Sequence, residues 1–240
     1  MGVRAISVGL SCLFLLGSAS VLWAQGGTIR GKVYFEGNPI RTRPISMKQD
    51  KACDALHGGK TIDSEEFVLN SDNTLQNVIV YAKTGTQGKV FRPVRTVAVL
   101  DQVMCMYTPR VLAVMTGQPV EIRNSDPLLH NVHFTSRANG EFNIGQPTKG
   151  VKMTRQFDRA EGPGSATFKC DVHPWMRAYL AVFDHPVFAV TGKDGSFTIR
   201  NVPAGTYVLE AWHERLGAIS QNVTVRAGQT VEVDFKFVRR

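Results

Sequence analysis

Short segments in which apolar and polar residues alternate run through most of the chain, and they constrain its fold more than any other feature. Such alternation is typical of β-strands with one buried face. The segment 28–35 alternates and ends at the turn-forming run 36–39, and 119–124 follows the turn residues 116–118. Only 48–57 has a helical period. Many short strands separated by glycine and proline predict an all-β chain folded into sandwiches.

The length of 240 residues, with 43% hydrophobic content, is enough for two domains. A boundary is expected at Asp184-His185-Pro186, because a second series of short strands follows it. We therefore predict one domain over 25–185, with an N-terminal extension or insertion, and a smaller sandwich over 186–240.

Residues 1–24 have the composition of a secretory signal peptide. Arg4 precedes the run 6–22, which is almost entirely apolar or small, and Ala19 or Ala24 would end the cleaved region. An uncleaved membrane anchor is the alternative, since the apolar run approaches spanning length. We expect a periplasmic or secreted protein that contacts a membrane only if the signal is uncleaved.

Export changes the interpretation of the four cysteines. Cys12 lies inside the signal, which leaves three cysteines in the mature chain. An oxidising compartment permits a disulfide, and Cys53 with Cys105 is the natural pair if Cys170 binds a metal. Two buried free thiols are the alternative.

The segment 170–176 places Cys170, His173 and Met176 at intervals of three residues. About forty residues upstream, 127–134 adds imidazoles beside an apolar run. One cysteine, two histidines and one methionine form the ligand set of a trigonal blue-copper site. Soft sulfur ligands favour Cu(I) and imidazoles tolerate Cu(II), so this set suits a metal that cycles between both states. The pattern therefore indicates electron transfer.

Each of these residues also has an interpretation other than a copper ligand. A lone cysteine in a strand is usually a small buried hydrophobe, and a lone methionine after it is usually part of a core. Zinc would accept the thiolate and both imidazoles but would gain little from Met176. His133 lies three residues from His130, so on a strand it would face the opposite side and belong to the outer surface.

The segments 129–134 and 170–177 resemble the ligand segments of cupredoxins of the amicyanin and plastocyanin type. The resemblance covers about 108–184, and 36–103 has no counterpart in it. It implies a Greek-key β-sandwich that holds one type 1 copper ion. The implied ligands are His130, Cys170, His173 and Met176.

The same resemblance implies how the site would be supported and reached. Asn131 would tie the two ligand segments together by hydrogen bonds. The edge of His173 would emerge through an apolar rim and act as the electron port. The rim would consist of Pro127, Leu128, Leu129, Pro174 and Trp175. Ordinary loop packing is the alternative for these five residues.

The segments 191–197 and 202–207 resemble carboxypeptidase regulatory-like domains, over 187–237. This resemblance implies a transthyretin-like β-sandwich without catalytic activity. It leaves Trp212-His213-Glu214 unexplained, and we expect His213 at the surface rather than behind the metal ligands or at a docking site.

The leading functional hypothesis is an exported blue copper protein that transfers single electrons between redox partners. A copper carrier or storage module with the same ligands is one alternative, and a non-metal interaction module is another. No enzyme is expected, because His57, His185 and His213 are isolated in the sequence and suggest no second, catalytic metal.

The formal net charge of +8 is spread along the chain without the basic and aromatic stripe of a nucleic-acid interface. Basic charge on an exported protein favours an acidic partner or surface. By the cupredoxin resemblance, the partner would be a c-type cytochrome or a dehydrogenase, with no nucleic acid involved.

Overall fold

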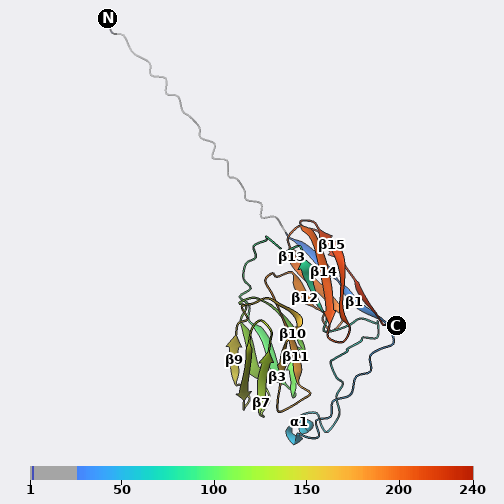
Figure 1. Ribbon diagram of the computed structural model, residues 1–240, viewed down its shortest axis with the longest axis vertical. Helices are drawn as coiled ribbons and strands as arrows, with labels where there is room; N and C mark the ends of the chain where they lie inside the picture. The colour runs from blue at the N-terminus through green and yellow to red at the C-terminus, as the bar shows by residue number, and fades with distance from the viewer. Residues whose placement is uncertain (1, 3–25, 240) are drawn as a thin grey trace.

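Two β-sandwiches lie against each other in the computed structural model, which describes residues 2 and 26–239 (Figure 1). The all-β fold class with two sandwiches is therefore confirmed. Apart from Gly2, the predicted signal peptide lies outside the described residues. Within the described part of the chain, no helix has the length and apolar character needed to cross a membrane.

The first sandwich, below in Figure 1, packs two sheets around an apolar core that includes Leu100, Val132, Phe134 and Phe168. One sheet has the strand order β4 (Met106–Thr108), β3 (Ala98–Val103), β6 (Val120–Asn124) and β9 (Lys152–Arg155). The other has the order β5 (Val111–Met115), β11 (Arg177–Phe183), β10 (Glu161–Lys169), β7 (His130–Thr135) and β8 (Glu141–Gln146).

The second sandwich also has two sheets, around a core that includes Val33, Val80, Leu209 and Phe235. One sheet has the order β12 (Phe188–Val190), β2 (Ile79–Thr84), β14 (Gly205–His213) and β15 (Gly217–Val225). In the other, β1 (Gly27–Gly37) pairs with β13 (Ser196–Val202), β16 (Thr230–Glu232) and β17 (Phe235–Arg239).

The sheets do not follow the predicted division into 25–185 and 186–240. β1 pairs antiparallel with β13 and parallel with β16 and β17, while β2 lies between β12 and β14. Two N-terminal strands therefore occupy central positions in the sandwich formed by the C-terminal strands. Without them, the strands after residue 186 would be left with unpaired edges. The first sandwich is inserted between β2 and β12 of the second.

The two sandwiches share an apolar interface. Along β11, Leu180 and Val182 face the first core, whereas Ala181 and Phe183 pack against β2 and β12. Residues on a strand alternate between its two faces, so β11 is buried on both sides. The contact fixes the two sandwiches to each other.

Between β1 and β2 the chain leaves the second sandwich and passes the end of the first, where it forms the short helix α1 (Lys51–Leu56) (Figure 1). The helical period predicted over 48–57 is confirmed at this helix. Asp50 is its N-cap and accepts hydrogen bonds from the backbone N–H groups of Ala52 and Cys53, both at 2.9 Å. The expected disulfide between Cys53 and Cys105 is present and joins α1 to the turn between β3 and β4.

Candidate metal centre

The predicted ligands meet at one end of the five-stranded sheet. His130 is the first residue of β7, Cys170 directly follows β10, and Met176 directly precedes β11. Because β10 pairs antiparallel with both β7 and β11, these three positions lie at the same end of the sheet. The loop between Cys170 and Met176 closes on itself: the N–H of Cys170 donates to the Met176 carbonyl at 3.3 Å, and the N–H of Met176 donates to the His173 carbonyl at 2.9 Å.

Three potential ligand atoms converge at this edge. The Nδ1 atoms of His130 and His173 are 2.9 Å apart, and Sγ of Cys170 lies 3.6 Å from Nδ1 of His173. All three ligand atoms lie within 4.8 Å of one another, and the side chains are at most 2% exposed. Met176 is 1% exposed and belongs to the same apolar cluster as Cys170.

A carboxylate contacts Nε2 of each histidine, which is the outer nitrogen because Nδ1 faces the thiol. Nε2 of His130 lies 2.9 Å from Oδ2 of Asp126, and Nε2 of His173 lies 3.3 Å from Oδ2 of Asp50. A carboxylate on the outer nitrogen fixes the ring orientation and leaves the inner nitrogen available as a ligand. Both imidazoles are therefore oriented with Nδ1 toward the thiol.

Asp126 also stabilises the turn that carries Cys105. Met104 and Cys105 adopt left-handed conformations, with φ of 55° and 52°, which cost non-glycine residues roughly 1 to 2 kcal/mol each. Asp126 accepts hydrogen bonds from both of their backbone N–H groups, at 2.8 and 2.7 Å. The Trp175 indole N–H donates to the carbonyl of Cys105 at 3.0 Å. The metal-centre edge and the disulfide turn thus form one hydrogen-bonded unit.

The electrostatics of the cluster favour a thiolate. Burial raises the pKa of Cys170, but hydrogen bonds with His130 and His173 outweigh it and bring the pKa down to about 6. Burial lowers the pKa of His130, and hydrogen bonds to Asp126 and Cys170 outweigh this and raise it overall. A thiolate is the form of cysteine that binds metals.

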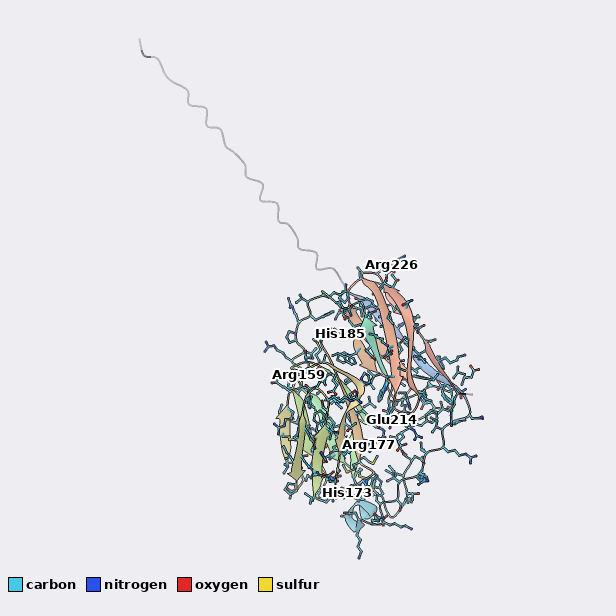
Figure 2. All side chains as sticks on the ribbon, viewed as in Figure 1. Arg159, His173, Arg177, His185, Glu214 and Arg226 are labelled. Carbon is cyan, nitrogen blue, oxygen red and sulfur yellow. A yellow bond between two sulfur atoms is a disulfide. The ribbon has the colours of Figure 1, made fainter. Side chains whose placement is uncertain are left out.

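The predicted exposure of His173 is wrong. Its side chain is 1% exposed, because α1 covers the outer nitrogen: Asp50 lies 3.3 Å from Nε2 and Sγ of Cys53 lies 3.5 Å from it. The ring of Trp175 packs beside it, with centroids 5.2 Å apart. Figure 2 shows His173 at the end of the first sandwich, next to α1. The cover comes from the segment 36–103, which has no counterpart in the cupredoxin resemblance.

The hydrogen bonds predicted for Asn131 are present. The Asn131 side-chain Oδ1 accepts a hydrogen bond from the backbone N–H of Asp171 at 2.5 Å. The backbone N–H of Asn131 donates to Sγ of Cys170 at 3.5 Å. His133 lies on the other face of β7 from His130, as predicted, and contacts Asp171 at 2.9 Å and Glu141 at 3.0 Å. Among the groups that the structure describes, His133 belongs to no metal-binding cluster.

Of the three remaining histidines, His213 differs from the prediction. His57 contacts the carbonyl of Met104 at 2.8 Å, and His185 is buried at the junction of the sandwiches. His213 was expected at the surface but is 1% exposed and packs edge-on against Phe67 and Phe237.

Sequence reasoning missed Asp50 and Asp126. A helix-capping role for Asp50 could be inferred from its place before the helical segment 48–57. Its contact with His173, 123 positions away, has no sequence signal. Asp126 lies four positions before His130, but that interval carries no meaning outside a helix.

Comparisons with known proteins find one family model and several solved structures. Residues 174–238 match the model of the carboxypeptidase regulatory-like domain. The match begins inside the ligand loop and ends near the end of β17. No curated protein is similar to the chain.

The chain is similar to cupredoxins. A methionine-to-alanine mutant of amicyanin in its Cu(I) form is 24% identical, with a TM-score of 0.32, over 43% of this chain and 97% of that one. A methionine-to-glutamine mutant of amicyanin, also Cu(I), is 28% identical, with a TM-score of 0.31, over 36% and 81%. A purple cupredoxin from Nitrosopumilus maritimus is 22% identical, with a TM-score of 0.30, over 35% and 98%. Neither type of match is to an enzyme.

The residues at this edge fit copper. A thiolate and two imidazole nitrogens converge, a thioether is packed in the same cluster, and both outer nitrogens are held by carboxylates. Mixed sulfur and nitrogen donors of this kind select copper over hard cations such as magnesium or calcium.

Proposed function

We propose that this chain is an exported type 1 copper protein that transfers single electrons between redox partners. The observation that carries the proposal is the convergence of Nδ1 of His130, Nδ1 of His173 and Sγ of Cys170 within 4.8 Å in a buried site. Met176 would hold the ion together with these three side chains. Bound copper would supply a one-electron couple between Cu(II) and Cu(I).

The protein's own contribution is to hold and enclose the ligands. Asp126 and Asp50 orient the two imidazoles, and Asn131 ties the His130 strand to the Cys170 loop. Burial of the ligands excludes water from the site. Ligands held in this way change position little between two oxidation states, which favours fast electron transfer.

Export is part of the same proposal. The signal-like composition of 1–24 supports it, and so does the disulfide between Cys53 and Cys105, because disulfides persist in oxidising compartments. The proposed location is the periplasm or the extracellular medium, and the proposed partner is a one-electron redox protein such as a c-type cytochrome or a dehydrogenase.

The visible spectrum of the Cu(II)-loaded mature chain tests the proposal. We expect an intense band at about 600 nm, which is characteristic of charge transfer from a thiolate to copper. Cys170→Ala should abolish the band. His133→Ala is the matched control, since His133 lies on the same strand as His130 but outside the cluster, and it should leave the band in place. A colourless wild-type protein would contradict the proposal.

A copper carrier is the second candidate, and the cover over His173 favours it. With Asp50 and Cys53 against Nε2, the usual route for an electron through the histidine edge is closed. Tight Cu(I) binding without reversible voltammetry would select the carrier, and a chain that holds no copper would select a non-metal interaction module.

A further inference from the structure

An open cleft lies beside the metal centre, between the two sandwiches and the segment that carries α1. Its volume is about 320 Å³. We call it the arginine cleft, because Arg43, Arg110, Arg177 and Arg215 line it, against only two carboxylates, Glu66 and Glu214. In Figure 2 Arg177 lies between Glu214 and His173.

The arginines differ in what they are free to bind. Arg110 is buried and bidentate on Glu214, with Nη2 to Oε2 at 2.8 Å, and Arg215 pairs with Glu66. Arg43 and Arg177 are exposed, and neither makes an ion pair within the described residues, although Arg177 hydrogen-bonds with Tyr179 of the same cleft. Two arginines without a carboxylate partner therefore line a space whose other charges are two ion pairs, and a site with this excess of positive charge attracts negative charge.

Trp175 lines the same cleft and separates it from the metal centre. Its ring packs against His173, with centroids 5.2 Å apart, and its indole N–H is fixed on the carbonyl of Cys105. Asp50 and Cys53 cover the edge of His173, while Trp175 both packs against this ligand and lines the open cleft.

We propose that the arginine cleft docks an acidic surface of a one-electron redox protein, and that Trp175 is the point where the electron passes. The proposed docking depends only on the arginine cleft. The proposed electron route through Trp175 rests on the proposed copper function. In the transfer, one electron would pass from the bound copper, oxidised from Cu(I) to Cu(II), to an oxidised acidic partner, which would be reduced. No bond or proton changes place. A protein surface suits the cleft because its walls come from four separate stretches of the chain, 43–66, Arg110, 174–179 and 214–215, and exposed arginines stand among them.

The first experiment tests docking with copper-free mature protein. Hexaglutamate is titrated into it by calorimetry at low and high ionic strength. The Arg43→Gln, Arg177→Gln double variant should bind roughly tenfold more weakly at low salt, and the difference should shrink at high salt as charges are screened. Arg159→Gln with Arg226→Gln is the matched control, because neither arginine lines the cleft and Figure 2 shows both away from Arg177 and Glu214.

Two results would overturn docking. One is an equal loss of affinity in the control double variant, which would mean that only net charge matters. The other is citrate binding as tightly as hexaglutamate, which would assign the cleft to a small anion instead of a protein surface.

The second experiment tests the electron route with Cu(I)-loaded protein. Oxidation is followed by stopped flow with the anion hexacyanoferrate(III) and with the cation tris(phenanthroline)cobalt(III). The Arg43→Gln, Arg177→Gln variant should slow the anion severalfold and not the cation. Trp175→Leu should slow both reagents, and Trp175→Phe, which keeps an aromatic ring beside His173, should restore most of the rate.

The outcomes separate the two proposals. Unchanged rates in Trp175→Leu would overturn the electron route. Failure of the chain to hold copper would overturn the proposed function and the electron route together, while calorimetry on the copper-free protein would still decide docking.

Discussion

The Asp50 carboxylate joins α1 to His173. Its Oδ1 accepts the backbone N–H groups of Ala52 and Cys53 at 2.9 Å, and its Oδ2 lies 3.3 Å from Nε2 of His173. One side chain thus begins the helix and fixes the imidazole that the helix covers. The hydrogen bond that Asp50 accepts from the backbone N–H of Cys53 lowers the pKa of its carboxyl group, and His173 adds to the effect, so the carboxylate is ionised at neutral pH.

Substitution of Asp50 should separate its two roles. Asp50→Asn keeps a good helix cap but removes the charge beside His173, whereas Asp50→Ala removes both. We expect Asp50→Ala to lower the free energy of unfolding by about 1 kcal/mol and Asp50→Asn to change it little. Both should raise the reduction potential of the loaded protein, because a nearby negative charge favours Cu(II). Urea unfolding and voltammetry measure the two effects, and an unchanged potential in both variants would contradict the role at His173.

Removal of the disulfide should destabilise the chain strongly. Cys53 and Cys105 are 52 positions apart, and closing a loop of that length stabilises the folded state by about 4 kcal/mol in the chain-entropy model. The Cys53→Ala, Cys105→Ala double variant should therefore unfold at a much lower urea concentration. Reductant should lower the midpoint of the wild type and leave that of the variant alone. Equal midpoints for wild type and variant would show that the bond contributes nothing.

The buried pair of Arg110 and Glu214 should behave differently from surface pairs. Both side chains are at most 5% exposed, and the pair links the start of β5 to the turn after β14. Arg110→Met leaves Glu214 buried without its partner and should cost roughly 3 to 5 kcal/mol of unfolding free energy, while Arg110→Met with Glu214→Leu should recover much of it.

The exposed pair of Arg30 and Glu232 is the control for the Arg110 and Glu214 variants. Arg30→Met should change the free energy of unfolding by less than about 1 kcal/mol. If the Arg110→Met single variant and the Arg110→Met, Glu214→Leu double variant lose the same stability, coupling between the buried partners would be disproved.

The ligands of the metal centre could be predicted from the sequence, but the contact that covers His173 could not. Cys170, His173 and Met176 share one seven-residue loop, so their spacing alone brings them together. His130 begins a strand whose pairing with β10 places it at the same edge. The cover is different, because Asp50 reaches His173 across 123 positions and no periodicity encodes that contact.

The same limit applies to the fold. Alternation predicts a strand over 28–35, but it does not indicate which strands this segment pairs with. β1 and β2 pair with strands that lie more than a hundred positions later in the chain. The expected boundary at 184–186 assigned the partners to different domains and was therefore inconsistent with this pairing. His213 is another case: Tyr207, Leu209, Ala211 and His213 alternate along β14 and all face the core, so the strand pattern itself indicated burial.

Burial of His213 makes the stability of the protein pH-dependent. Burial, with the charges of Arg110 and Arg215 adding to it, lowers the pKa of His213 to about 4. An unfolded chain has a histidine pKa of about 6.5, so between these values it binds a proton that the folded chain does not. The free energy of unfolding should therefore fall by roughly 3 kcal/mol on this account as the pH drops from about 6.5 to 4.

Comparison of His213→Asn with the wild type isolates this effect. Asparagine keeps an acceptor for the backbone N–H of Arg215, which His213 Nδ1 accepts at 3.1 Å, but it does not titrate. Urea unfolding of the copper-free proteins at about pH 7 and pH 4.5 should show a loss roughly 2 to 3 kcal/mol smaller in the variant. His57→Asn, at a partly buried histidine outside this core, is the matched control and should follow the wild type. If His213→Asn loses as much stability as the wild type in acid, proton uptake at His213 is not the cause, and other groups govern the acid sensitivity of the fold.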